Sequence, residues 1–103
     1  MRKAKVYNFG ELAGILSDDD GKYTFKYLNE YKGYSISLTM PREQQEFTFS
    51  TFPAFFDGLL PEGNQLEALL KTAKLDRHDL FGQLVTVGQD LVGSVTLKAL
   101  SDE

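Results

Sequence analysis

The chain has 103 residues, of which 42% are hydrophobic and 25% charged, a composition typical of one globular domain with a hydrophobic core. Its formal net charge of -4 disfavours direct binding to nucleic acid or to an anionic lipid surface, because the average field repels phosphate. It contains no cysteine, which excludes disulfides, thiolate metal sites and a cysteine nucleophile. Neither a signal peptide nor an apolar run of the ~20 residues needed for a membrane span is present. We therefore expect one domain over residues 1–103, and the cytoplasm is its simplest expected location.

In the first half of the chain, apolar and polar residues alternate with a period of two, which is typical of half-buried β-strands. Turn residues separate the first three of these segments, which predicts an antiparallel meander. Pro41 ends a fourth segment, which we expect to form a short edge strand. The predicted strands cover residues 3–8, 12–17, 22–27 and 34–40, with a brief further strand over residues 47–49.

After this point the hydrophobic spacing changes to the helical period. A first helix is predicted over residues 53–60, with Pro53 in its first turn. The segment Pro61-Glu62-Gly63 breaks it, and a second helix is predicted over residues 66–73, with Glu67 four residues before Lys71. The apolar face of the first helix is predicted to be structural core and comprises Phe52, Phe55, Phe56, Leu59 and Leu60.

The last part of the chain predicts a third helix and a final strand. Asp76 is the expected N-cap of the helix, with Asp79 three positions on, and Gly88 marks the helix end. Alternation returns over residues 91–98, which predicts a strand that rejoins the N-terminal sheet. The predicted fold class is therefore α+β, an antiparallel sheet of about five strands packed with three helices.

Residues suited to catalysis or metal binding are few. His78 is the single histidine, and its position beside charged residues predicts an exposed, solvated side chain. Asp18, Asp19 and Asp20 lack the ligand spacing of a calcium loop and predict a charged hairpin turn. Lysines and tyrosines interleave over residues 22–34, which we interpret as aromatic packing on a sheet with lysines at its rim. We expect no catalytic residue, no metal site and no cofactor.

One segment has a recognisable pattern. The aromatic-rich helix that runs into Leu59-Leu60-Pro61-Glu62-Gly63 resembles the signature of the N-terminal subdomain of HipA-type kinases. Three further segments agree with it, the opening Val6-Tyr7 with Gly10, Leu12 and Gly14, the predicted strand end at residues 36–41, and the closing segment at residues 90–95. The resemblance covers nearly the entire chain.

HipA proteins are serine/threonine kinases of bacterial toxin-antitoxin systems, and their catalytic region, which follows this subdomain, has no counterpart here. The chain begins at Met1 and stops after the last predicted strand, as we expect of an independent gene product. It is thus similar to HipS, the small subunit of split HipBST systems, in which the kinase HipT and the helix-turn-helix DNA-binding protein HipB are separate chains. The resemblance implies a non-catalytic antitoxin that binds and restrains a HipT-like kinase, with a HipB-like protein as a second candidate partner.

Within this resemblance, the expected partner-binding residues are Pro61, Glu62, Gly63, Asn64 and Gln65. Many relatives carry a tryptophan just after Pro-Glu-Gly, where this chain has Asn64, so restraint is expected to depend on the wider surface. Three alternatives stay open. The first is a scaffold or co-repressor without inhibitory activity. The second is an N-terminal fragment of a full-length HipA kinase, and the third is a small-molecule-binding or enzymatic domain.

Overall fold

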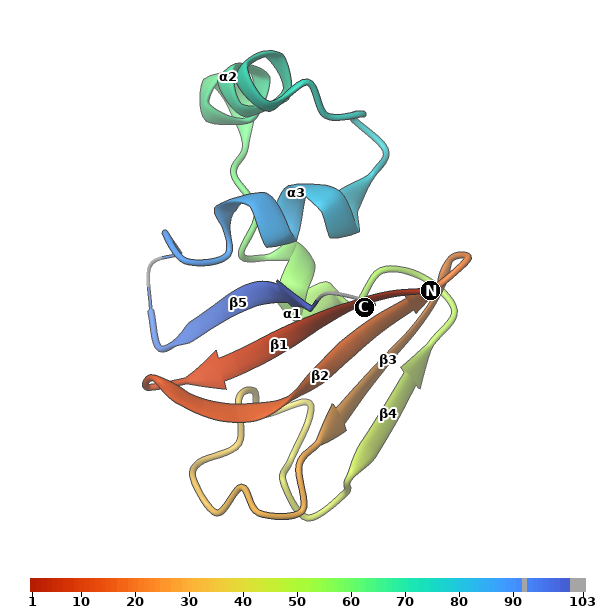
Figure 1. Cartoon of the computed structure of the whole chain (residues 1–103), viewed down its shortest axis with the longest axis vertical. Coiled ribbons are helices and arrows are strands. Elements are labelled where there is room, and N and C mark those ends of the chain that lie inside the picture. Colours follow the sequence, from red (N-terminus) through yellow and green to blue (C-terminus); the bar gives the residue numbers. More distant parts are fainter. Residues whose placement is uncertain (92, 101–103) are drawn as a thin grey trace.

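The computed structural model describes residues 1–91 and 93–100, which form a five-stranded antiparallel sheet and three helices (Figure 1). The strands follow one another across the sheet in the order β4-β3-β2-β1-β5, so the last strand returns beside the first, as predicted. The strands are β1 (Arg2–Asn8), β2 (Glu11–Asp19), β3 (Lys22–Tyr27), β4 (Glu46–Phe49) and β5 (Val95–Leu100). The helices are α1 (Ala54–Asp57), α2 (Gly63–Ala73) and α3 (Leu80–Val87). The predicted α+β class is confirmed.

The hydrophobic core lies between one face of the sheet and the helices. Successive side chains along a strand point to opposite faces, and the covered face carries the buried apolar residues of the strands. Phe56 of α1 and Leu84 of α3 pack into this layer, with the Phe56 ring centroid 6.1 Å from that of Phe25. The apolar residues with no exposed surface are Ala4, Val6, Ala13, Leu16, Phe25, Phe56, Leu84 and Leu97. The other face of the sheet carries no helix (Figure 1).

The predicted strand over residues 34–40 is wrong. The structure has only an isolated bridge there, between Ser37 and Met40, and the edge of the sheet is β4. The hydroxyl of Tyr27 explains the difference, because it accepts a hydrogen bond from Ile36 N (3.0 Å) and donates one to Met40 O (2.6 Å). Backbone groups that a sheet ladder would use are thus bound to a core side chain. Of the tyrosines expected to pack on the sheet, Tyr34 is instead 80% exposed.

The first helix is much shorter than the predicted range of residues 53–60. α1 is a single turn. The chain then continues through backbone hydrogen bonds that span three residues instead of four, from Leu59 N to Phe56 O and from Leu60 N to Asp57 O, each at 3.1 Å. Phe56 alone among the five predicted core residues is fully buried. The other four, Phe52, Phe55, Leu59 and Leu60, are half-buried against the core.

The beginnings of α2 and α3 also differ from prediction. α2 starts at Gly63 rather than at residue 66. The N-cap of α3 is Asp79, whose Oδ1 accepts from Gly82 N (3.0 Å), whereas Asp76 accepts from His78 N (2.7 Å) in the preceding turn. The last strand runs to Leu100 and begins later than predicted, at Val95. One residue of its predicted range, Val92, lies outside the described residues.

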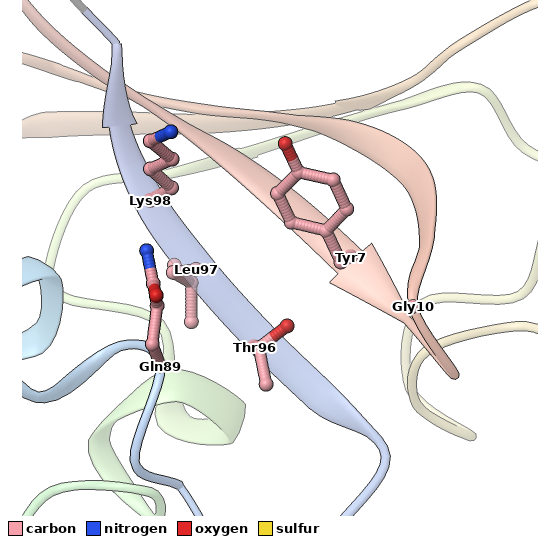
Figure 2. Close-up of a pocket in the computed structure, with 6 residues that line it drawn as sticks. All are labelled: Tyr7, Gly10, Gln89, Thr96, Leu97 and Lys98. Atoms are coloured by element: carbon pink, nitrogen blue, oxygen red, sulfur yellow. The ribbon is translucent and has the colours of Figure 1, made fainter.

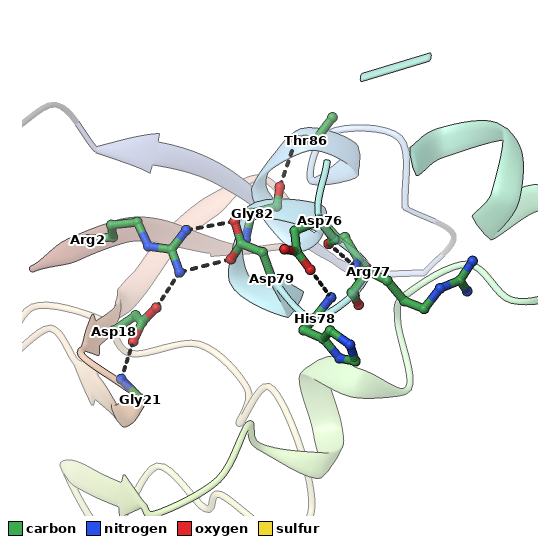
Figure 3. Close-up of polar contacts among 10 residues, drawn as sticks. Arg2, Asp18, Gly21, Asp76, Arg77, His78, Asp79, Gly82 and Thr86 are labelled. Atoms are coloured by element: carbon green, nitrogen blue, oxygen red, sulfur yellow. Dashed lines mark hydrogen bonds and ion pairs between the residues drawn. The ribbon is translucent and has the colours of Figure 1, made fainter. Parts of the chain in front are cut away.

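Arg2 connects the sheet to the start of α3 (Figure 3). Its Nη2 atom lies 2.5 Å from Asp18 Oδ2 on β2 and 2.9 Å from Asp79 Oδ1, and its guanidinium carbon lies 4.9 Å from the ring centroid of Phe81. Asp18 is only 6% exposed and belongs to β2, so the acidic hairpin turn is shorter than predicted and consists of Asp20 and Gly21. Charge-assisted hydrogen bonds to a shared guanidinium fix the position of α3 on the sheet.

Candidate partner-binding site

The five residues predicted to bind a partner connect α1 to α2. Figure 1 shows this connection and α2 at the end of the molecule, away from the sheet. Pro61 is half-buried, and the four residues that follow are exposed. Gly63 has φ 58°, a left-handed conformation that glycine adopts without steric cost, and this explains the sharp change of direction after Glu62. The segment is therefore an exposed corner with a defined backbone.

A surface hollow of about 320 Å³ lies beside this corner. Leu59, Pro61 and Gln65 come from the α1–α2 side of the hollow. Val87 and the segment after α3 form its other side, with Asp90 and Leu91. Apolar side chains with a few polar groups between them suit an apolar side chain of another polypeptide. The complete lining is Gly58, Leu59, Pro61, Gln65, Val87, Asp90 and Leu91.

The structure thus brings two of the predicted partner-binding residues, Pro61 and Gln65, into the hollow and leaves three outside its lining. Glu62, Gly63 and Asn64 are exposed at the neighbouring corner. Sequence reasoning missed the contribution of Val87, Asp90 and Leu91. Residues 90–95 belong to the family pattern, but nothing in their local spacing indicates that they lie beside Pro61.

α2 itself has an incompletely covered apolar face. Leu66, Leu69 and Leu70 are half-buried, and no residue of α2 is buried. Glu67, expected to pair with Lys71, instead forms an ion pair with Arg77 at 2.8 Å between two exposed side chains. Such a pair contributes at most about 1 kcal/mol. An amphipathic helix with this little burial offers apolar surface to another chain.

The groups with shifted pKa values lie elsewhere in the molecule. Burial raises the pKa of Tyr27, and the hydrogen bond from Arg2 lowers that of Asp79, but neither residue lines the hollow. His78 is exposed, as expected. Among residues 1–91 and 93–100 there is no group of three or more acidic or histidine side chains placed to hold a metal ion. No helix in the same residues is long and apolar enough to cross a membrane.

Comparison with known proteins relates this architecture to one family. Residues 4–98 match the model of the HipA N-terminal domain. The chain is 32% identical over 98 residues to an uncharacterised protein of Haemophilus influenzae, and the match covers 95% of this chain and 92% of that protein. A solved structure of the N-terminal domain of HipA toxin superposes with a TM-score of 0.82 at 31% identity, covering 100% of this chain and 96% of the other. The chain belongs to the HipA N-terminal domain family.

Proposed function

We propose that the chain is a non-catalytic regulatory subunit that binds and restrains a separate HipA-like serine/threonine kinase of the HipT type. A HipB-like DNA-binding protein is the second partner in this proposal. The observation that carries it is the surface formed by residues 58–70, where a hollow with apolar walls adjoins a helix that has no buried residue. Family membership supports the proposal, because this domain belongs to the HipA toxin family.

Docking of a kinase on this surface has a clear physical basis. Leu66, Leu69 and Leu70 are each only half-buried, and covering them removes further apolar area from water at about 25 cal/mol per Å². A standard interface takes about 800 Å² from each partner. The chain exposes 6623 Å², so roughly an eighth of its surface is needed. The polar corner at Asn64 then lies at the rim, where it contributes specificity.

The direct test uses the purified chain and the kinase encoded beside its gene. We expect a complex with a dissociation constant below about 1 μM, and lower kinase autophosphorylation when the chain is in excess. Calorimetry measures the affinity, and incorporation of labelled phosphate measures activity. Absence of association at micromolar concentration contradicts the proposal. A complex with unchanged autophosphorylation favours the scaffold alternative instead.

A matched pair of variants locates the interface. Gln65→Arg places a bulky charge in the hollow, whereas Gln44→Arg makes the same change in the loop at the opposite end of the molecule. Both glutamines are exposed, so both variants should fold. We expect Gln65→Arg to weaken kinase binding at least about tenfold, a loss typical of disturbing an interface centre, and Gln44→Arg to leave it unchanged. Equal affinities for the two variants place the interface elsewhere.

A further inference from the structure

The uncovered face of the sheet carries lysines that share one row. Strand pairing places Lys5 of β1 directly opposite Lys98 of β5 on one side and opposite Ile15 of β2 on the other. Ile15 in turn lies opposite Lys26 of β3. Because Ala4, Val6 and Leu97 point into the core, their neighbours Lys5 and Lys98 point to the open face. Lys3 lies on the same face, two residues before Lys5.

These lysines have little local compensation. Side chains directly opposite each other on paired strands lie about 5 Å apart, and like charges in that arrangement destabilise a sheet. Within residues 1–91 and 93–100, none of Lys3, Lys5, Lys26 and Lys98 has a carboxylate within ion-pair distance. The row ends at one acidic residue, Glu46 of β4, which lies opposite Lys26 in the strand register. Strand pairing places five lysines on this face, Lys3, Lys5, Lys22, Lys26 and Lys98, against Asp19 and Glu46, so the face is basic on a chain whose net charge is -4.

A hollow of about 380 Å³ adjoins the Lys5–Lys98 pair (Figure 2). Tyr7 and Thr96 are paired across β1 and β5, and both residues line the hollow together with Lys98 and Gln89. The hydroxyls, the amide and the ammonium group are all hydrogen-bond donors. Donors gathered beside positive charge are the arrangement that receives a carboxylate.

We propose that this open face, centred on Lys5, Lys98 and the hollow at Tyr7, binds an acidic segment of a partner protein. Its dimensions fit such a segment. The row from Lys26 to Lys98 crosses three strand spacings of about 4.8 Å, which equals the length of roughly four extended residues. The three lysines of the row, Lys26, Lys5 and Lys98, therefore match a short run of Asp or Glu side chains.

Nucleic acid fits this face less well than an acidic peptide does. Among the residues of the five strands, Tyr7 is the single aromatic side chain on the lysine face, whereas single-stranded nucleic acid is bound by several aromatic groups that stack with bases. Duplex DNA carries a charge every ~1.7 Å and extends beyond a patch of this size, over the rest of a negatively charged protein. A short acidic segment interacts with the patch alone.

The test measures binding of a fluorescein-labelled oligoglutamate peptide to the full chain by anisotropy. The matched probes are an oligoglutamine peptide and an oligothymidylate of equal length. We expect the oligoglutamate peptide to bind at least about tenfold more tightly than either, and added salt to weaken its binding. Tighter binding of oligothymidylate overturns the proposal in favour of nucleic acid, and equal binding of the two peptides overturns it altogether.

Two double variants assign the binding to this face. Lys5→Gln with Lys98→Gln removes the opposed pair, whereas Lys71→Gln with Lys74→Gln removes the same charge from the last turn and C-cap of α2. We expect the first pair to reduce affinity for oligoglutamate at least about fivefold and the second to leave it nearly unchanged. Equal losses in the two variants overturn the proposal, because net charge alone then explains the binding. Circular dichroism checks that both variants are folded.

Discussion

Asp79 has two interactions at the start of α3, and two substitutions separate them. Its carboxylate caps the helix at Gly82 N and also pairs with Arg2. Asparagine keeps an N-cap acceptor but loses the charge, whereas alanine loses both interactions. We therefore expect Asp79→Ala to lower the free energy of unfolding by about 1 kcal/mol more than Asp79→Asn does. Urea denaturation at neutral pH measures both, with the exposed Asp57→Ala as a control that should change stability little.

The stability difference between the wild-type chain and these variants should depend on pH. Because the hydrogen bond from Arg2 lowers the pKa of Asp79 below its ordinary value of 3.8, the folded state favours the charged carboxylate. This contribution is complete above the ordinary pKa and is lost as the pH falls through the lowered one. The stability difference between the wild-type chain and Asp79→Asn should therefore shrink as the pH falls below about 4. A difference that is constant between pH 7 and pH 2 contradicts the ion-pair contribution.

At the scale of elements, two glycines at helix ends serve different purposes. Gly63 begins α2 with φ 58°, and an added Cβ there meets nothing within 4 Å. Gly88 follows α3 with an ordinary φ of -54°, but a Cβ would lie 2.4 Å from the backbone oxygen of Leu97 in β5. The first glycine is required by backbone conformation, and the second by the close approach of α3 to the sheet.

Alanine at each position should distinguish these reasons. Gly63→Ala costs about 1–2 kcal/mol of backbone strain, with the core unchanged. Gly88→Ala must move α3 away from β5, because the opposing atom is backbone, and we expect a loss of about 3 kcal/mol or more. Thermal denaturation compares the two variants. A Gly88→Ala chain as stable as Gly63→Ala would show that the end of α3 shifts at little cost.

The strands show where local pattern is sufficient and where it is not. β3 has the predicted bounds of residues 22–27, because its alternation coincides with the burial of Phe25 and Tyr27. Residues 34–40 alternate equally well, yet Ile36 and Met40 are held by the hydroxyl of Tyr27. That interaction joins residues nine and thirteen positions apart. Alternation indicates which side chains are buried, but it does not indicate which groups form hydrogen bonds with the backbone of the same residues.

In the helices and the candidate site, too, local sequence pattern does not indicate contacts between distant residues. Asp76 and Asp79 both precede the apolar run of α3, and the structure has the second as the cap, where its carboxylate also binds Arg2, 77 positions away in the chain. The corner at residues 61–65 was predictable, because proline and glycine change the backbone locally. The other wall of the hollow was not, since Val87 and Leu91 reach it only through the packing of α3.

At the scale of the whole molecule, stability is distributed unevenly between the sheet and α2. The buried core residues come from the sheet, α1, α3 and the loop before β4, whereas α2 has none and is tied to Arg77 by an exposed ion pair. Local opening requires less free energy where fewer apolar contacts are broken. In the free chain, we expect the backbone amides of α2 to exchange with solvent faster than those of β1, β2 and α3.

Binding of a kinase should change this distribution at one end only. If the surface at residues 58–70 is the interface, the half-buried Leu66, Leu69 and Leu70 become covered, and α2 can open only after the partner leaves. Hydrogen exchange read by mass spectrometry should then show strong protection over residues 61–73 in the complex, with β1 and β2 unchanged. The loop at residues 28–45, at the opposite end of the molecule, is the internal control. Protection confined to that loop, with α2 still exchanging as in the free chain, places the kinase on the opposite end and contradicts the proposed site.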